Sequence, residues 1–248
     1  MLGQNSFLSN ITPVVKKLLI INAGVLILAF FYKAATGIEA THVIGLFYVK
    51  SEAFRPFQIV THMFMHAGFI HLFFNMYALW LFGQILERVW GGKRFLIYYL
   101  ITGFGAAALH FFVVYLRSEA LMADMSAEEI NLVLERGHNA ILSQKNFIDS
   151  QMAELNGMIN VPTVGASGAV FGVLLAFGMF FPNIELYFIF IPIPIKAKYL
   201  VIGYGALELF NAIANTPGDN IAHFAHLGGM LFGFILIKIW GKPTGNFY

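Results

Sequence analysis

Two residues of this chain, Ser167 and His226, could carry out nucleophilic chemistry together. Ser167 lies in the sequence Gly-Ala-Ser-Gly at 165–168, and His226 lies in Ala-His-Leu-Gly-Gly at 225–229. A serine hydroxyl is a weak nucleophile until a base removes its proton, and a neutral imidazole can be that base. Gly165 and Gly168 leave the hydroxyl uncrowded and let a substrate backbone approach it. The pair predicts serine hydrolase chemistry, provided that the fold brings the two side chains together.

His71 and Asn75 are four residues apart and therefore share one face of a helix. Acyl transfer requires hydrogen-bond donors aimed at the oxyanion that develops in the transition state. An imidazole N–H and an amide can both serve, so these residues are candidates for an oxyanion hole. Interhelical hydrogen bonding is the alternative interpretation of the same two side chains.

The composition indicates a membrane protein. Of the 248 residues, 58% are hydrophobic and only 11% are charged, whereas soluble domains carry about 25% charged residues. A net charge of +2 does not favour nucleic acid as a partner. The absence of cysteine excludes disulfides, thiolate nucleophiles and thiolate-ligated metals. The first apolar run follows Lys16 and Lys17 without a cleavage site, so we expect it to remain as a span.

A helix needs about 20 mostly apolar residues to cross a bilayer. Six segments approach this requirement, and the chain is therefore expected to form an all-α membrane protein with a six-transmembrane-helix bundle, as one domain over residues 1–248. The expected spans are 14–32, 67–86, 95–116, 164–181, 197–214 and 221–240.

The lysine and arginine residues of the connections predict the orientation. With the N-terminus inside, nine fall in short inner segments and six in much longer outer ones. This asymmetry predicts a multi-pass membrane protein with both termini cytoplasmic, and we expect the membrane to be a bacterial inner membrane. Spans two, four and six then start at the outer face, which places His71, Asn75, Ser167 and His226 at similar depths, about 6–13 Å below the outer boundary.

Small residues explain how spans four and six could meet. Gly168 and Gly172 are four residues apart on span four, as are Gly229 and Gly233 on span six. This spacing lets helix backbones pack closely in lipid, although it also occurs in membrane helices without catalytic residues. Close packing here would bring Ser167 towards His226.

No acid lies near His226 in the sequence, so the pattern predicts a dyad rather than a triad. Phe171, one turn beyond Ser167, could pack against the imidazole and hold it in place. His223 is interpreted as an interfacial residue or a bystander, His110 as a packing residue, and Glu208 as a structurally paired acid inside span five. The histidines raise the possibility of zinc, but no HExxH motif occurs and spans two, four and six lack carboxylates in their outer halves, so no metal and no cofactor are expected.

Two long outer connections flank these spans. Residues 33–66 contain Phe47, Tyr48, Phe54 and Phe57 and are expected to lie on or in the membrane. Residues 117–163 hold seven of the thirteen acids and predict amphipathic helical pieces, with a capping box at 126–129. This polar insertion is interpreted as a solvated helical region, with a regulatory or substrate-guiding lid as the alternative.

At these residues the chain strongly resembles the rhomboid family of intramembrane serine proteases. Three motifs carry the resemblance, in order on alternate spans: His-Leu-Phe-Phe-Asn at 71–75, Gly-Ala-Ser-Gly at 165–168 and Ala-His-Leu-Gly-Gly at 225–229. His62, His66, the Phe-Arg pair at 54–55 and the Glu-Arg pair at 87–88 also match the family's spacing, and the similarity extends over residues 14–240.

The resemblance implies a Ser–His dyad with Ser167 as nucleophile and His226 as general base. His71, Asn75 and the Ser167 backbone N–H would form the oxyanion hole, with Gly165, Gly168 and Phe171 in support. Substrates would be single-span membrane proteins within the lipid bilayer, cut in or near the transmembrane segment after a small residue. They would enter past span five, with the loops 33–66 and 215–220 acting as gate and cap. The alternative is a catalytically silent relative that binds or sorts membrane clients.

The chain departs from the family pattern at three places. Phe171 stands where many members have tyrosine, Phe54 precedes Arg55 where tryptophan is frequent, and the 117–163 connection is longer than in compact members. A stacking role survives the first change, whereas a role for the tyrosine hydroxyl does not.

Overall fold

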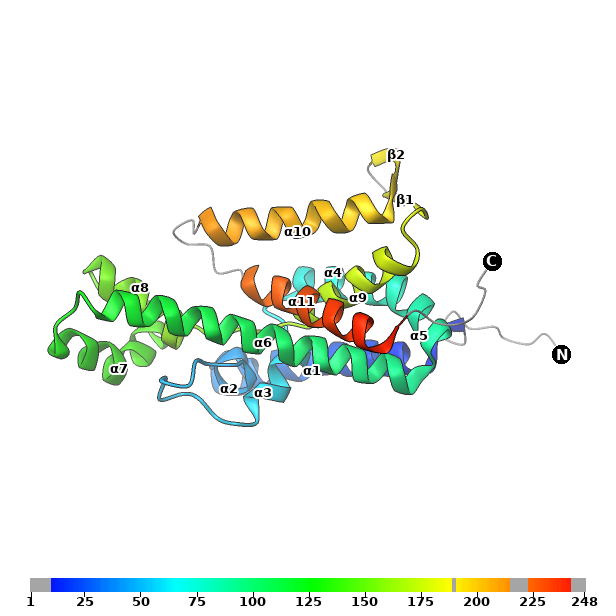
Figure 1. The fold of residues 1–248 in the computed structure, drawn as a ribbon. Coiled ribbons are helices and arrows are strands. Elements are labelled where there is room, and N and C mark those ends of the chain that lie inside the picture. Colours follow the sequence, from blue (N-terminus) through cyan, green and yellow to red (C-terminus); the bar gives the residue numbers. More distant parts are fainter. Residues whose placement is uncertain (1–9, 189–190, 215–222, 242–248) are drawn as a thin grey trace.

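The computed structural model describes residues 10–188, 191–214 and 223–241. These residues form a helical bundle with one small hairpin (Figure 1). The α-helices are α1 (Pro13–Thr36), α2 (Thr41–Ile44), α3 (Gln58–Thr61), α4 (Phe69–Ala78), α5 (Gln84–Trp90), α6 (Gly92–Met122), α7 (Ala127–Leu142), α8 (Ser150–Asn160), α9 (Ser167–Phe180), α10 (Ala197–Ala214) and α11 (His223–Trp240).

All six expected helices occur, with ends that differ from the expected ones by a few residues. The second is continuous from Phe69 to Trp90, because a π-helical stretch at Leu79–Gly83 joins α4 to α5. Within the described residues, four helices are long and apolar enough to cross a membrane: α1, Phe69–Trp90, α6 and α11. Helix α9 has only 14 residues and lies inside the bundle, so it meets little lipid. The chain is an all-helical, multi-pass integral membrane protein.

Helix α1 begins with the help of a distant acid. No side chain caps it locally, but the buried carboxylate of Glu87 accepts hydrogen bonds from the backbone N–H groups of Val14 and Val15, both at 2.9 Å. Free N–H groups at a helix start carry partial positive charge, which an acid stabilises. Glu87 therefore fastens the start of α1 to the end of α5.

Helix α9 is the centre of the bundle. Nine of its residues are buried, among them Gly168, Gly172 and Phe177, and α6 and α11 pack alongside it (Figure 1). A Cβ added at Gly229 would lie only 1.8 Å from the carbonyl oxygen of Gly168. The expectation that glycines let spans four and six touch is confirmed, because the space between the two backbones is too small for a methyl group at Gly229.

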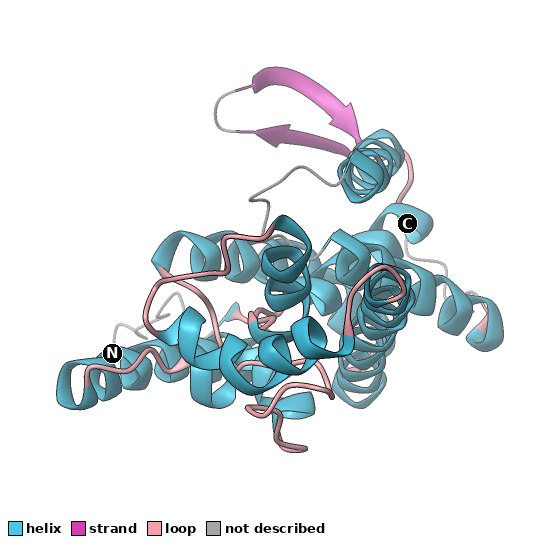
Figure 2. Ribbon diagram, turned by 90° about the vertical axis from the view of Figure 1, so that its left-hand side faces the viewer, coloured by secondary structure: helices cyan, strands magenta, loops and turns pink. Residues whose placement is uncertain are grey.

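A feature that the sequence analysis did not anticipate lies between α9 and α10. Strands β1 (Glu185–Phe188) and β2 (Ile191–Lys196) form an antiparallel hairpin. Figure 2 shows it projecting from the helical body beside α10. The hairpin leaves the helical class of the fold unchanged.

The polar insertion folds as predicted, into amphipathic helices. The capping box at the start of α7 is present: Ser126 accepts from the Glu129 N–H, and Glu129 accepts from the Ser126 N–H. Helices α7 and α8 pack together, and α8 packs against α6, which extends six residues beyond the expected span. Val133, Leu155 and Ile159 form a small apolar core there with Tyr48 from the connection at residues 33–66.

Hydrogen bonds join the insertion to the connection at residues 33–66. Ser51 donates to Asn160 at 2.6 Å, and Asn160 in turn donates to Asn156 at 2.9 Å. The backbones of Leu46 and Thr163 exchange two hydrogen bonds of 2.9 Å. Phe47 and Tyr48 are buried. The connections 33–66 and 117–163 therefore form one packed layer at the end of the bundle.

Candidate active site

Ser167 is the first residue of α9, slightly nearer the helix start than the sequence suggested. Gly165, two residues earlier, has φ of +126°, a conformation that favours glycine. A Cβ at this position would also lie 2.9 Å from the His71 ring. The N–H groups of the first helical turn have no intrahelical acceptor, so the Ser167 N–H is available beside its own hydroxyl.

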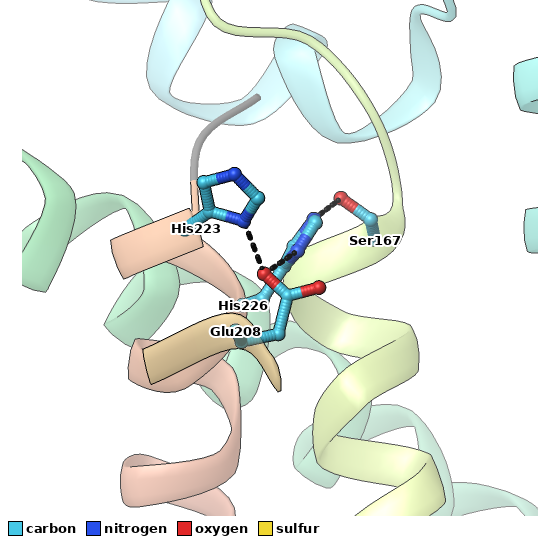
Figure 3. A network of polar contacts seen from close by, with 4 residues as sticks. All are labelled: Ser167, Glu208, His223 and His226. Carbon is cyan, nitrogen blue, oxygen red and sulfur yellow. Dashed lines mark hydrogen bonds and ion pairs between the residues drawn. The ribbon is translucent and has the colours of Figure 1, made fainter. Parts of the chain in front are cut away.

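His226 lies in the first turn of α11 and faces Ser167. Its Nε2 is 2.8 Å from Ser167 Oγ, within hydrogen-bond range (Figure 3). The structure thus brings together the two side chains that the sequence singled out, from positions 59 residues apart.

Phe171 stacks on the His226 ring, as predicted. The ring centroids are 4.3 Å apart and the planes differ by 7°. The phenyl ring covers one face of the imidazole and so restricts its rotation. This contact needs no hydroxyl, which explains how phenylalanine can stand in a position where tyrosine was expected.

His71 and Asn75 line the same cavity as Ser167 and His226. The cavity has a volume of about 860 Å³ and lies between α4, α6, α9, α10 and α11. Asn75 donates to the backbone carbonyl of His71 at 3.0 Å, and the His71 ring packs edge-on against His66 at 5.0 Å. His71, Asn75, Ser167 and His226 therefore share one cavity.

His62 and His66 lie in the segment that precedes α4, and His62 lines the cavity. His62 Nδ1 is 2.9 Å from the carbonyl oxygen of Gln58, and His66 Nε2 accepts from the Ala166 N–H at 3.5 Å. Burial lowers the pKa of each ring to about 4, so both are neutral near pH 7. They support the segment that leads into Ser167. His110 pairs with Thr163 at 3.1 Å, consistent with its predicted packing role.

The expectation that no acid accompanies His226 is wrong. Glu208 Oε2, from α10, lies 3.0 Å from Nδ1 of His226 and 2.6 Å from Nδ1 of His223 (Figure 3). The contact with His226 has ion-pair geometry, because the N–H direction is not aligned for a hydrogen bond. His223 is buried and bonded rather than an interfacial bystander. Glu208 is paired, as expected, but its partners are the two histidines.

A sequence signal for this contact existed. Glu208 is an ionisable residue inside an apolar helix, and such residues require a polar partner. The sequence did not identify the partner, because Glu208 and His226 are 18 positions apart in the chain.

Glu208, His223 and His226 are also the residues that could hold a metal ion. Their three ligand atoms lie within 4.8 Å of one another. Two imidazole nitrogens and a carboxylate oxygen suit zinc, whose structural sites have four ligands. The same atoms already contact one another directly: Glu208 Oε2 is hydrogen-bonded to His223 Nδ1 and lies within ion-pair distance of His226 Nδ1.

The chain matches the family model of the Rhomboid domain over residues 53–243. It is 28% identical over 185 residues to RHOMBOID-like protein 6, mitochondrial, from Arabidopsis thaliana, covering 73% of this chain and 43% of that protein. It is 26% identical over 193 residues to Rhomboid protease GluP from Bacillus subtilis (strain 168), covering 76% of this chain and 27% of that protein.

A third relative, RHOMBOID-like protein 12, mitochondrial, from Arabidopsis thaliana, is 29% identical over 218 residues, which cover 87% of this chain and 55% of that protein. The chain therefore spans between about a quarter and just over half of the length of these relatives.

Proposed function

Since the chain belongs to the rhomboid family, we propose that it is an intramembrane serine endopeptidase in which Ser167 is the nucleophile and His226 the general base. Family membership supports intramembrane proteolysis at the family level. The observation that carries the assignment to this chain is the 2.8 Å contact between His226 Nε2 and Ser167 Oγ.

Acylation begins with proton transfer from Ser167 Oγ to His226 Nε2. The oxygen then attacks the carbonyl carbon of the scissile peptide and forms a tetrahedral intermediate. When this intermediate collapses, the C–N bond breaks and His226 returns the proton to the leaving amine. Phe171 supports both transfers, because its stacked ring keeps the imidazole facing Ser167.

The oxyanion is stabilised by three groups around the cavity: the Ser167 backbone N–H, His71 and Asn75. The Ser167 N–H lies at a helix start, where the partial positive charge favours an anion. In the free protein the Asn75 side-chain amide donates a hydrogen bond to the His71 carbonyl. When the oxyanion forms, this amide turns towards the substrate.

Deacylation requires water, which the surrounding lipid excludes. The cavity beside Ser167 is lined by polar groups of His62, His71, Asn75 and His110. Irregular, polar surface at membrane depth is tolerated where it borders a water-filled cavity. Water enters through this cavity, and His226 removes a proton from it to release the acyl group.

The substrates are transmembrane segments of membrane proteins, cut after a small residue within the bilayer or near it. They reach the cavity laterally past α10, with residues 33–66 as a gate. The predicted cap, 215–220, lies outside the described residues. The enzyme resides in a bacterial inner membrane with both termini cytoplasmic and its site open to the outer face, in keeping with the lysine and arginine distribution.

A fluorophosphonate probe tests the assignment in detergent. We expect the wild-type protein to be labelled at Ser167 and the Ser167→Ala variant not at all. His226→Ala should label at a rate reduced by orders of magnitude, because the serine loses its base.

Cleavage of a reporter transmembrane substrate is measured alongside, with a melting temperature for each variant to show that it is folded. Cleavage that persists in Ser167→Ala would overturn the proposal. The silent, client-binding alternative predicts no labelling and no cleavage by the wild-type protein.

A further inference from the structure

Glu208 connects the proposed base to a second histidine on the same helix. Its Oε2 lies 2.6 Å from Nδ1 of His223 and 3.0 Å from Nδ1 of His226. The carboxylate comes from α10, whereas both histidines lie on the first turn of α11 (Figure 3). One oxygen atom therefore joins two imidazole rings across a helix interface.

The place of this oxygen selects the tautomer of His226. An ionised carboxylate only accepts hydrogen bonds, so the 3.0 Å contact is attractive when Nδ1 carries a hydrogen. A neutral imidazole has one N–H, and Nε2 then keeps its lone pair. Nε2 is the nitrogen that faces Ser167 Oγ. The carboxylate thus leaves free the atom that must accept the serine proton.

The same contact suits the charged state that follows. When His226 takes the proton from Ser167, the ring becomes a cation 3.0 Å from a carboxylate. The side chains of Glu208 and His226 are only 10% and 12% exposed, so water screens their attraction weakly. Phe171 restrains the ring plane, but its uncharged ring neither selects a nitrogen nor balances the charge.

His223 explains how an acid can stay in this place. A carboxylate removed from water is costly unless it is paired and hydrogen-bonded. Glu208 is only 8% exposed, and the shorter of its two contacts is to His223. His223 therefore anchors the carboxylate, while the remaining capacity of the same oxygen is directed at His226.

We propose that Glu208, anchored by His223, is a positioning residue that fixes the tautomer of His226 and stabilises its imidazolium. The active site is then a Ser167–His226–Glu208 triad assembled from α9, α11 and α10. In the acylation step the Oγ proton moves to Nε2, the bond from Oγ to the carbonyl carbon forms, and Glu208 remains ionised throughout. This inference rests on the proposed function.

A purely structural role is the rival interpretation, in which Glu208 only fastens α10 to α11. Most side chains of α10 point away from the bundle: Tyr199, Ile202, Phe210 and Ile213 are each more than 60% exposed. Loss of such a fastening would change substrate access and thermal stability. It would not change how fast Ser167 reacts with a small molecule that needs no movement of α10.

The test is therefore the rate at which a small fluorophosphonate labels Ser167 in Glu208→Gln, which keeps the shape of the side chain and removes its charge. We expect labelling to be at least about tenfold slower. With the reporter substrate, kcat should fall to a similar extent while KM stays unchanged. Glu208→Asp, which restores the charge, should label faster than Glu208→Gln.

Glu87→Gln is the matched control, because Glu87 is also a buried glutamate bound to two N–H groups but lies away from the cavity. It should lower the melting temperature and leave the labelling rate at the wild-type value. A Glu208→Gln variant that behaved in the same way would overturn the positioning role.

Two further outcomes separate this inference from its premise and from a metal site. If Ser167→Ala abolished labelling while Glu208→Gln labelled at the wild-type rate, the triad would fail and the proposed function would stand. If a chelator abolished wild-type labelling and zinc restored it, Glu208 and the histidines would be metal ligands, and the triad would be wrong.

A measurement on the wild-type protein remains decisive should the Glu208 variants not fold. Nitrogen-15 NMR of labelled histidines reports the tautomer of His226, with its signals assigned by their loss in His226→Asn. The triad requires hydrogen on Nδ1 and a bare Nε2. A hydrogen found on Nε2 of the neutral ring would refute it.

Discussion

The membrane bundle and the polar insertion hold their helices together in different ways. In the bundle, α9 and α11 lie so close together that a Cβ added at Gly229 would be 1.8 Å from the Gly168 carbonyl oxygen. In the insertion, α7 and α8 use a capping box, an asparagine chain and a small apolar core. Apolar side chains gain little by leaving lipid, so bundle helices depend on close backbone packing, whereas the insertion can use burial from water.

This difference bears on function, because only the closely packed pair sets the distance between Ser167 and His226. The insertion contributes to the rim of the cavity through Ile141 and Val161. Changes in the bundle should therefore affect reactivity, while changes in the insertion should affect local stability.

Gly229→Ala is expected to have the largest effect, because it acts on the close packing of the bundle. Its Cβ would meet the Gly168 carbonyl oxygen at 1.8 Å, so α9 and α11 must separate. A displacement of about 1 Å at reacting atoms can cost about a hundredfold in rate, and we expect a loss of this size in fluorophosphonate labelling.

Gly203→Ala, on α10, is the control, because a Cβ at that glycine would have no neighbour within 4 Å. It should label at the wild-type rate. Equal losses in the two variants would show that α9 and α11 do not set the reactive distance.

Removing the ring that stacks on His226 should have a smaller effect within the same region. Phe171→Leu keeps an apolar side chain but loses the 4.3 Å stack. An aromatic pair contributes about 0.5–1.5 kcal/mol beyond its burial, which corresponds to about twofold to tenfold in rate. Phe171→Tyr should label at nearly the wild-type rate, and a tyrosine variant as slow as the leucine variant would contradict a stacking role.

In the insertion, Ser126→Ala removes the cap of α7. The Glu129 N–H loses its acceptor, which should destabilise the first turn of α7 by about 1 kcal/mol. Hydrogen exchange of the amides at 128–130 should quicken by about fivefold, while labelling of Ser167 remains unchanged. A slower labelling rate would show that the insertion and the bundle are coupled.

The smallest expected effect is a pH dependence of the stability of the contact between the insertion and the connection at residues 33–66. The His138 ring packs against His42 and Phe47 there. Burial lowers the pKa of both histidines, with His42 adding to the shift at His138, while Glu39 and Glu52 offset part of it.

In the unfolded chain these rings titrate at about pH 6.5, so below that pH the unfolded state binds more protons than the folded one. The stability of this contact is complete above pH 6.5 and declines on acidification. Protection of α7 amides, corrected for intrinsic exchange, should fall between pH 7 and 5 in the wild type and less in His138→Phe. An unchanged pH dependence in that variant would exclude His138 as its source.

Local pattern carried much of the fold. The lengths of the apolar segments predicted all six helices, and the capping box from Ser126 to Glu129 predicted the start of α7. Both signals depend on residues that are neighbours in the chain. The sequence did not predict the hairpin between α9 and α10, because the short apolar run at 184–195 resembles a helix end as much as a strand.

The candidate site divided in the same way. Ser167, His226, His71 and Asn75 could be placed around one cavity from the order and direction of the spans, and Phe171 could be placed one turn from the serine. Glu208 could not, because its partner lies on another helix and the packing of α10 against α11 decides which face it presents.

Composition and apolar periodicity are properties of the chain, so they predict a helical membrane protein and the side chains able to do chemistry in it. Which of these side chains touch depends on how the helices pack. The 2.8 Å contact between Ser167 and His226 follows from two helices that approach through glycine. The 3.0 Å contact between His226 and Glu208 follows from a third helix that buries a charge beside them. Both are distances between separate helices, and no pattern along one helix encodes them.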